Sequence, residues 1–175
     1  MMIPVKVKKL HPDAVIPKYS TPGSAGFDLV AVEDAIIEPG KTVKVRTGLA
    51  FEIPPGYELQ IRPRSGISAK TKLRIANAPG TVDADYRGEV CVLLQNTEQI
   101  FLADGWGPPL KGTAHYIDGE KYIEEYTYGT YIIRKGDRIA QGVIAPVYRA
   151  AFEVIDELSE TERGSGGFGS TGVTA

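Results

Sequence analysis

The chain contains few of the residues that build disulfides and metal sites. Among its 175 residues there are one cysteine and two histidines. A single cysteine cannot close an internal disulfide, so a disulfide-stapled secreted scaffold is excluded. The two histidines, His11 and His115, lie far apart in the chain. With one cysteine they cannot supply the ligands of an ordinary zinc site.

An excess of charge of one sign is also missing. Lysine and arginine number 20 against 22 aspartates and glutamates, for a formal net charge of −2. A groove for long nucleic acid normally shows a basic excess, so we expect no nucleic-acid partner. No apolar run approaches the length that spans a bilayer, and residues 1–9 lack the unbroken apolar core of a signal peptide. We therefore expect a cytoplasmic protein with no membrane partner.

Turn-forming residues, by contrast, are abundant. The sequence has 20 glycines and 12 prolines, about 18% of the chain against a usual combined share of roughly 12%. A hydrophobic content of 42% argues against wholesale disorder, and the length suits one domain with a substantial core. This combination favours an all-β fold with many turns.

Short segments of alternating or continuous apolar residues recur between turn signals, at the spacing of a β-sandwich or barrel. We expect strands at Pro4–Lys9, Thr42–Leu49, Tyr57–Ile61, Val90–Leu94 and Ile139–Val147. The unbroken apolar run at Val90–Leu94 is typical of a strand buried on both faces. The one helix candidate is Gly66–Leu73, which Ser65 or Ser68 could cap.

Two regions differ from this pattern. Residues 101–131 hold the only tryptophan and five of the nine tyrosines, and within them Tyr116–Tyr122 is typical of a hairpin closed by an Asp-Gly turn. The tail, Arg163–Ala175, consists mainly of glycine, serine and threonine. Such a composition cannot build a core, so we expect the tail to be mobile in isolation.

Two segments place charged residues where partners are needed. Asp28 stands in an otherwise apolar strand, so it requires an arginine, backbone N–H groups or a hydrated metal, unless it only caps a turn. Arg138 follows a Lys-Gly-Asp turn and could pair with Asp28 or Asp85, while Gln141 could reach a ligand. The competing interpretation is an ordinary turn with an internal salt bridge.

The segment Arg62–Ser68 combines two guanidinium groups, serine hydroxyls and a glycine at the expected helix start. Fork-shaped arginines, hydroxyls and free N–H groups together suit a phosphate. A polar turn with solvated arginines is the alternative.

The segment Asn77–Glu89 carries a tight turn followed by Asp83 and Asp85. On a strand these two acids would face the same side, where one could activate water while an arginine holds the other. Backbone groups of a hairpin could read a small polar ring, and Tyr86 could pack on a sugar or base. A charged surface hairpin is the alternative.

The tail could also have a role. Its many backbone N–H groups, together with Arg163 and Phe168, could fold over a nucleotide, with the ring on the base and the guanidinium on phosphate. It is not a Walker A loop, because no Gly-Lys-Ser/Thr sequence occurs within residues 163–175. A low-complexity end without function is the alternative.

The order of these segments resembles the five ordered motifs of the trimeric dUTPase family. The matching stretches are Ala25-Gly26-Phe27-Asp28-Leu29, Pro63-Arg64-Ser65-Gly66, Gly80-Thr81-Val82-Asp83-Ala84-Asp85-Tyr86-Arg87-Gly88, Gly136-Asp137-Arg138-Ile139-Ala140-Gln141 and residues 163–172. The resemblance implies a β jelly-roll, or distorted barrel, that assembles as a homotrimer with three active sites at subunit interfaces. It also implies hydrolysis of dUTP to dUMP and pyrophosphate, which lowers dUTP and supplies dUMP for dTTP synthesis.

The resemblance also implies roles for single residues. Asp83 would orient and deprotonate the water that attacks the α-phosphorus. The hairpin would read uracil largely through backbone groups, and Tyr86 would pack under the deoxyribose and disfavour a 2′-hydroxyl. The uracil-reading residues would be Asn77, Gly80, Thr81 and Val82, with Cys91 contributing only its main chain.

At the phosphate end, the contacts would come from Arg64, Ser65, Gly66 and Gln141. Mg²⁺ would be held mainly by the triphosphate with no direct protein ligand, and Asp28 would support its water shell or the motif network. Asp85 and Arg138 would be structural. The tail of a neighbouring subunit would close over the substrate, with Phe168 on uracil, Arg163 on the γ-phosphate, and Gly169 and Ser170 nearby.

The resemblance divides the chain into a β domain at residues 1–162 and a lid at residues 163–175. Within the domain, residues 97–135 form a connection much longer than the dozen or so residues usual in this family. The simplest interpretation is a tolerated surface hairpin. Our hypothesis is that its aromatic residues form an extra trimer contact or a partner-binding patch.

Two other functions compete. A related dCTP deaminase would need a catalytic glutamate in the pocket and a serine where Gly66 stands, and it would release ammonia. A jelly-roll module without enzymatic activity would have no need for Asp83, Tyr86, Arg163 and Phe168 together.

Overall fold

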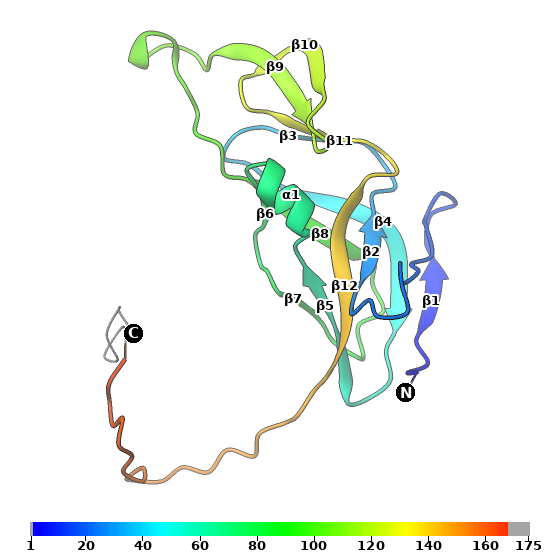
Figure 1. The fold of residues 1–175 in the computed structure, drawn as a ribbon, viewed down its shortest axis with the longest axis vertical. Coiled ribbons are helices and arrows are strands. Elements are labelled where there is room, and N and C mark those ends of the chain that lie inside the picture. Colours follow the sequence, from blue (N-terminus) through cyan, green and yellow to red (C-terminus); the bar gives the residue numbers. More distant parts are fainter. Residues whose placement is uncertain (1, 168–175) are drawn as a thin grey trace.

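The computed structural model describes residues 2–167, apart from the side chains of residue 104 and residues 123–125. Within these residues the chain forms strands β1–β12, one short α-helix and one 3-10 turn, η1 (Ala103–Gly105). The predicted all-β fold is confirmed. The strands form three open sheets of four strands each and do not close into a barrel (Figure 1).

The first sheet has the order β1-β4-β8-β6, and all its pairs are antiparallel. Its strands are β1 (Lys6–Lys9), β4 (Thr42–Glu52), β8 (Val90–Asn96) and β6 (Leu73–Ile75). The register between β4 and β8 shifts between Arg46 and Leu49, where Gly48 has a positive φ of 67°. This bulge bends β4 beside the start of β8.

The second sheet carries three of the predicted site segments. Its order is β2-β12-β5-β7, with β2 (Phe27–Val30), β12 (Arg138–Pro146), β5 (Tyr57–Arg62) and β7 (Gly80–Val82). The strands β2 and β7 therefore lie at opposite edges of one sheet. Two strands separate Asp28 on β2 from the hairpin that follows β7.

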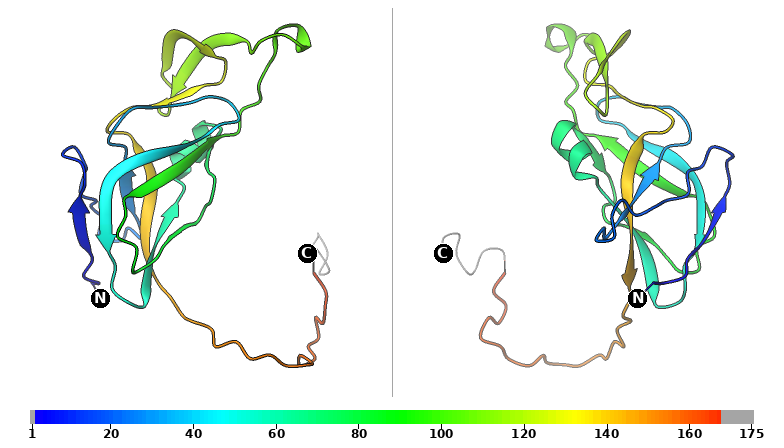
Figure 2. Two further views of the ribbon diagram at one scale, coloured as in Figure 1. Left: turned by 180° about the vertical axis from the view of Figure 1, so that it is seen from behind. Right: turned by 45° about the vertical axis from the view of Figure 1, so that its right-hand side comes forward.

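The third sheet contains most of the long connection. Its order is β10-β9-β11-β3, with β10 (Lys121–Thr127), β9 (Lys111–Tyr116), β11 (Tyr131–Ile133) and β3 (Ala35–Ile37). The predicted hairpin is confirmed, because β9 and β10 pair antiparallel across a turn in which Gly119 has a φ of 98°. Figure 2 shows this hairpin at one end of the molecule.

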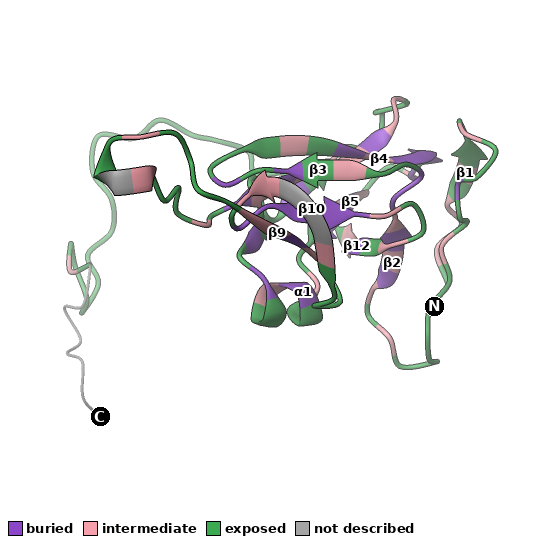
Figure 3. Ribbon diagram, turned by 90° about the horizontal axis from the view of Figure 1, so that it is seen from above, coloured by how far each residue is buried: buried purple, intermediate pink, exposed green. Residues whose placement is uncertain are grey.

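One apolar core holds the sheets together. Leu29, Leu59, Leu73, Val92 and Ile133 are all fully shielded from solvent and belong to one cluster. Seen from above, the buried residues gather between the layers (Figure 3). Burying such side chains contributes about 1.5–3 kcal/mol each.

Two local expectations need correction. The helix α1 spans Ser65–Lys70, so it begins one residue earlier and ends three residues earlier than predicted. Its N-cap is Arg64, with no side-chain hydrogen bond, so neither serine caps it. Along β8, buried and half-buried residues alternate. The expectation that Val90–Leu94 is buried on both faces is therefore wrong.

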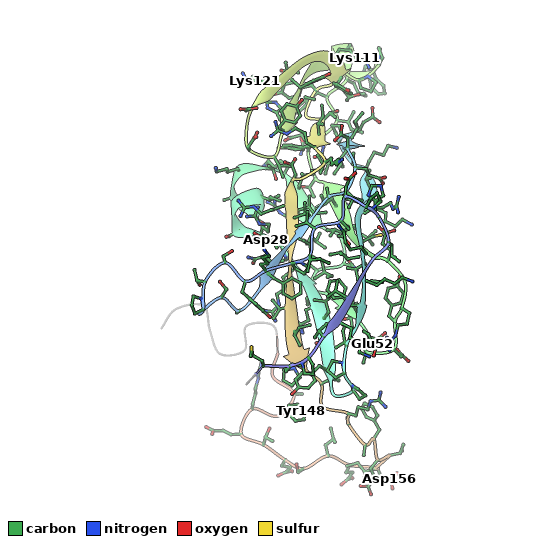
Figure 4. All side chains as sticks on the ribbon, turned by 90° about the vertical axis from the view of Figure 1, so that its right-hand side faces the viewer. Asp28, Glu52, Lys111, Lys121, Tyr148 and Asp156 are labelled. Atoms are coloured by element: carbon green, nitrogen blue, oxygen red, sulfur yellow. The ribbon has the colours of Figure 1, made fainter. Side chains whose placement is uncertain are left out.

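The last strand ends at Pro146, and residues 147–167 form no helix or strand. This arm leaves the end of β12 and runs away from the sheets (Figure 1). Tyr148 lies where it begins and Asp156 further along it, at the opposite end of the molecule from Lys111 and Lys121 (Figure 4). No helix among the described residues is long and apolar enough to cross a membrane.

Candidate functional site

A cavity of about 410 Å³ opens beside the hairpin that connects β7 to β8. Five of its lining residues were predicted to bind a nucleotide: Asn77, Thr81, Val82, Asp83 and Tyr86. Cys91 also lines it, and the remaining lining residues are Lys44, Arg46, Glu89, Val90 and Leu93. We call this space the Asp83 cavity.

Asp83 stands at the mouth of this cavity. The strand β7 ends at Val82, and Asp83 opens a turn in which the Tyr86 N–H donates to the Asp83 carbonyl at 3.2 Å. Asp83 and Asp85 are therefore not on a strand, and the argument that a strand aligns them on one face is wrong. Asp83 lines the Asp83 cavity. Asp85 does not, and it borders a second, wider hollow that Asp83 also lines.

The hydroxyl group of Tyr86 is held by a hydrogen bond, while the residue remains partly exposed to solvent. Its Oη donates to the Glu89 carbonyl at 3.1 Å, and the residue remains 46% exposed. Arg87 braces the same turn, because its guanidinium donates to the carbonyls of Ala84 and Tyr86 at 2.7 and 3.0 Å. The hairpin is thus held in a shape that leaves the Tyr86 ring available to pack against a ligand.

Glu89 and Arg46 are cavity residues that the sequence motifs did not single out. The Arg46 guanidinium donates to both oxygens of the Glu89 carboxylate, at 3.2 and 3.0 Å. Glu89 also accepts from the Gly48 N–H at 2.8 Å, so the pair rests on the β4 bulge. The hydrogen bond and charge of Glu89 raise the Arg46 pKa. Because the partners lie 43 residues apart, only the fold brings them together.

Burial raises the pKa of the Cys91 thiol, and the nearby Glu89 charge acts in the same direction. The thiol is therefore neutral at physiological pH. Since the thiolate is the reactive form, Cys91 is poorly suited to act as a nucleophile.

A second group of predicted residues lies on β2, β12 and the segment before α1. Arg64 Nε donates to Asp28 Oδ1 at 2.9 Å, and Arg138 donates from Nη1 to Asp28 Oδ2 at 3.2 Å. Arg64 also donates to the Arg138 carbonyl at 3.0 Å. We call these three residues the Asp28 cluster. Of the two partners considered for Arg138, the structure selects Asp28.

The other predicted phosphate contacts border the Asp28 cluster. Gln141 lies on β12. In the strand register it is paired with Asp28 on the neighbouring β2 and with Arg62 on the neighbouring β5. Ser65 and Gly66 begin α1 directly after Arg64, and both are exposed. Space around Gly66 is open, since an added Cβ would meet no atom within 4 Å. Arginine, hydroxyl, amide and free backbone N–H groups therefore gather at one place.

The two groups do not meet in one chain. None of the residues of the Asp28 cluster lines the Asp83 cavity, and neither do Ser65, Gly66 or Gln141. The strands β2 and β7 are three strand spacings apart, or roughly 14 Å. The chain thus presents the Asp83 cavity at one edge of the sheet and, at the other, a cluster of donors of the kind that bind phosphate.

The tail is only partly described. Arg163 Nε donates to the Gly166 carbonyl at 2.8 Å within an exposed turn of the arm. The predicted contacts Phe168, Gly169 and Ser170 lie outside the described residues. Among the residues that are described, no three histidine, cysteine, aspartate or glutamate side chains gather as a metal site.

Comparisons with known proteins agree in naming one family. The sequence model of the dUTPase family matches residues 13–105 and 122–172. The chain is 46% identical to a deoxyuridine 5′-triphosphate nucleotidohydrolase of Nautilia profundicola over 168 residues, which cover 96% of this chain and 98% of that protein. The internal gap in this match, residues 106–121, falls inside the long connection.

Solved structures give the same result. The dUTPase of Staphylococcus bacteriophage 80alpha with dUPNHPP is 35% identical, with a TM-score of 0.87 and coverage of 97% of this chain and 99% of that chain. A mutant dUTPase from phage phi11 of S. aureus, whose structure reveals the coordination of a structural Mg(II) ion, is 29% identical. Its TM-score is 0.77, over 88% of this chain and 97% of that one. Sequence, fold and the order of the site segments together place this chain in the dUTPase family.

Proposed function

We propose that the protein is a Mg²⁺-dependent dUTP diphosphatase that hydrolyses dUTP to dUMP and pyrophosphate. The observation that carries this proposal is the Asp83 cavity, lined by the hairpin residues of the dUTPase motif in a chain that belongs to that family. In a cell the reaction would lower dUTP and supply dUMP for dTTP synthesis. We place the enzyme in the cytoplasm, with no nucleic-acid or membrane partner.

The nucleoside binds in the Asp83 cavity. Uracil is read largely by backbone groups of the hairpin around Asn77, Gly80, Thr81 and Val82, and by the main chain at Cys91. Backbone donors and acceptors fixed in this way would reject cytosine, because its hydrogen-bonding pattern is reversed, and thymine would be rejected if the hairpin leaves no room for its methyl group. Tyr86 packs under the deoxyribose, where its ring disfavours a 2′-hydroxyl.

Asp83 acts as the general base. Its carboxylate orients a water molecule and accepts a proton from it while the water oxygen forms a bond to the α-phosphorus. The bond from the α-phosphorus to the bridging oxygen breaks, and pyrophosphate leaves with that oxygen. The exposure of Asp83 at the cavity mouth supports this role, because a water can reach it from the side where the phosphates would lie.

The Asp28 cluster supplies the phosphate end of the site. Arg64 and the neighbouring Ser65, Gly66 and Gln141 are donors suited to a triphosphate. In this proposal the ion would be held by phosphate oxygens of the substrate, and the Asp28 carboxylate could accept hydrogen bonds from its water shell. Mg²⁺ held in this way would neutralise charge on the phosphates.

We further propose a homotrimer whose sites combine several subunits. The distance across the second sheet supports this arrangement, because the Asp83 cavity of one chain is not lined by that chain's own Asp28 cluster. A neighbouring subunit would bring its Asp28 cluster to the cavity, with Asp85 and the Asp28–Arg138 pair in supporting roles.

The arm supports the same conclusion. Three of its apolar side chains, Tyr148, Phe152 and Val154, are 92%, 96% and 100% exposed in the single chain. Large apolar side chains in an extended segment gain stability by packing on another surface, and a second subunit provides one. Residues 163–175 would then act as a lid, with Arg163 on the γ-phosphate, Phe168 on uracil, and Gly169 and Ser170 beside them.

The long connection at residues 97–135 could add a contact to this trimer or to another protein. Trp106 is 95% exposed, and Phe101 and Tyr128 are 46% and 49% exposed around an edge-to-face ring contact. Deleting Gly105–Tyr128 tests the idea by the dissociation of the trimer on dilution. An unchanged dissociation constant and an unchanged set of bound partners would contradict it.

The function itself is tested by pyrophosphate release in the presence of Mg²⁺ from dUTP, dTTP, dCTP and UTP. We expect turnover of dUTP alone and no ammonia from dCTP. Hydrolysis of dTTP at a comparable rate, or deamination of dCTP, would overturn the proposal.

A further inference from the structure

The turn between β11 and β12 is fastened on one side to β2. Within the turn, the Arg134 N–H donates to Asp137 Oδ2 at 2.8 Å, and the Asp137 N–H donates to the Arg134 carbonyl at 3.0 Å. The Gly136 N–H donates to the Ala31 carbonyl, and the Ala31 N–H donates to the Asp137 carbonyl, both at 2.9 Å. The turn is therefore attached just beyond the end of the strand that carries Asp28.

The hairpin formed by β9 and β10 fastens the other side of this turn. The Arg134 guanidinium forms an ion pair with Asp118 and another, at 3.5 Å, with Glu120, both in the hairpin's own turn. The guanidinium carbon of Arg134, Cζ, also lies 4.1 Å from the centre of the Tyr116 ring. A guanidinium can bind a carboxylate and stack on an aromatic face together, which an ammonium group cannot do equally well.

The two charged groups of this contact, Asp118 and Arg134, both remain ionised at neutral pH. The pKa of Asp118 is lowered, first by the hydrogen bond from the Glu120 backbone and then by Arg134. Asp118 in turn raises the Arg134 pKa, chiefly through their hydrogen bond. Both groups are therefore charged across the pH range in which the enzyme would work.

A second attachment lies beside α1. The Lys72 N–H donates to Tyr131 Oη at 3.1 Å, and Thr97 Oγ1 donates to the Lys72 carbonyl at 2.8 Å. The ends of the long connection thus border the segment after α1 as well as the start of β12. Figure 1 shows the β9–β10 hairpin beyond these two elements, at the end of the molecule.

We propose that Arg134 is a positioning residue for the phosphate end of the site and that the β9–β10 hairpin holds it in place. Arg134 orients the turn that starts β12, and Arg138, the first residue of β12, contacts both Asp28 and Arg64. This inference rests on the proposed function. It gives the long connection a role inside the enzyme, through contacts with the part of the site that would bind the triphosphate.

The test compares a triphosphate ligand with a monophosphate ligand. The variants are Arg134→Gln, Arg134→Lys and Asp118→Asn, with Lys121→Gln as the matched control. Lys121 is exposed in the same hairpin and forms no ion pair among the described side chains. Calorimetry would measure the affinity for the triphosphate ligand dUpNHpp and for the monophosphate ligand dUMP. Steady-state kinetics would give KM and kcat for dUTP.

We expect Arg134→Gln to bind dUpNHpp about three- to fivefold more weakly. The loss is small because the ion pairs of Arg134 are partly exposed and act on the ligand only by positioning Arg138. KM for dUTP should rise by a similar factor. The dUMP affinity should stay unchanged, because the nucleoside binds in the Asp83 cavity. Asp118→Asn should act in the same direction, Arg134→Lys should fall between Arg134→Gln and the wild type, and Lys121→Gln should match the wild type.

A merely structural role would weaken both ligands together or lower the melting temperature alone. Either result, or unchanged dUpNHpp affinity in Arg134→Gln, would overturn the inference while leaving the proposed function intact. If Arg134→Gln fails to fold, Asp118→Asn decides the same question, because it keeps the arginine. A wild-type protein that neither binds dUpNHpp nor hydrolyses dUTP would overturn the proposed function, and this inference with it.

Discussion

Asp28 and Asp83 carry the same side chain in different surroundings. Asp28 is held by two guanidinium groups, whereas Asp83 lies exposed at the mouth of its cavity. Both oxygens of the Asp28 carboxylate already accept hydrogen bonds from arginines, whereas a water molecule can reach the exposed Asp83 carboxylate from solvent. This difference agrees with the roles that we propose, in which Asp83 is the base and Asp28 has a supporting role.

Replacing Asp83 by asparagine removes the proposed base and keeps the size and shape of the side chain. We expect turnover of dUTP to fall at least about a hundredfold, the lower range for loss of a general base. The affinity for dUpNHpp should remain within a factor of about two or three, because the cavity and its backbone donors are unchanged. Single-turnover kinetics and calorimetry would measure both quantities. An active Asp83→Asn variant would contradict the assignment.

Cys91 offers a second test at the residue scale. Since burial raises its pKa, we expect alkylation by iodoacetamide at pH 8 to be slower than for a free cysteine peptide, and slower still with dUMP bound. The folded protein favours the neutral Cys91 thiol. The free energy of unfolding should therefore be unaffected by this group below the ordinary pKa of a thiol, and it should fall as the pH rises from that value through the raised pKa of the folded state. Cys91→Ser should retain turnover, and its inactivation would show that the thiol takes part in the reaction.

The β4 bulge illustrates how one element shapes the cavity. It bends the strand at Gly48, whose N–H holds Glu89 in the cavity wall. A Cβ at Gly48 would lie 2.7 Å from His11 and 2.9 Å from Val32, and the φ of 67° is unfavourable for other residues.

Gly48→Ala should therefore lower the free energy of unfolding by about 2–4 kcal/mol, the sum of backbone strain and overpacking. Gly56→Ala is the control, because Gly56 also has a positive φ but no atom within 4 Å of an added Cβ. It should cost only about 1 kcal/mol. Urea unfolding would measure both, and equal losses would show that crowding at Gly48 is unimportant.

Local sequence signals predicted the elements that depend on near neighbours. The Asp118-Gly119 signal predicted the turn and the paired strands on either side of it, and the structure confirms them. The helix was misplaced because Arg64 serves as the N-cap without a side-chain bond, so no capping signal marks the boundary. The turn that begins at Asp83 was taken as part of a strand, because the chain leaves the sheet right after Val82 without a proline to mark the point.

Contacts between distant segments were harder to predict. The pairing of Arg138 with Asp28 was one of two alternatives, and strand register decides it, because Arg138 faces Val30 on β2. No local sequence signal predicts the ion pairs Arg46–Glu89 and Arg134–Asp118. The two partners of each pair are far apart in the sequence, and only the fold brings them together. Family resemblance marked the motif residues but said nothing of these supports.

At the scale of the whole molecule, the single chain separates the cavity from the Asp28 cluster and extends its arm into solvent. Both features suit an assembly in which each site draws on several subunits. Truncation after Glu162 should therefore lower dUTP turnover at least about a hundredfold, since the proposed lid would no longer complete the site, while the proposed trimer should survive. Analytical ultracentrifugation and kinetics would measure these, and a fully active truncated enzyme would rule out the lid.

Mixed assemblies separate contributions from different chains. A truncated chain keeps its hairpin, and an Asp83→Asn chain keeps its arm. If the hairpin and the arm of one site come from different subunits, co-expression of the two inactive variants should restore part of the activity. Mixed trimers without any recovered activity would show that one subunit supplies both.

The central claim, water attack at the α-phosphorus of dUTP, is tested most directly by hydrolysis in ¹⁸O-labelled water with Mg²⁺. Mass spectrometry of the products would locate the label. The account predicts one ¹⁸O atom in the phosphate of dUMP and none in pyrophosphate. Label in pyrophosphate, or the absence of dUTP turnover, would contradict it.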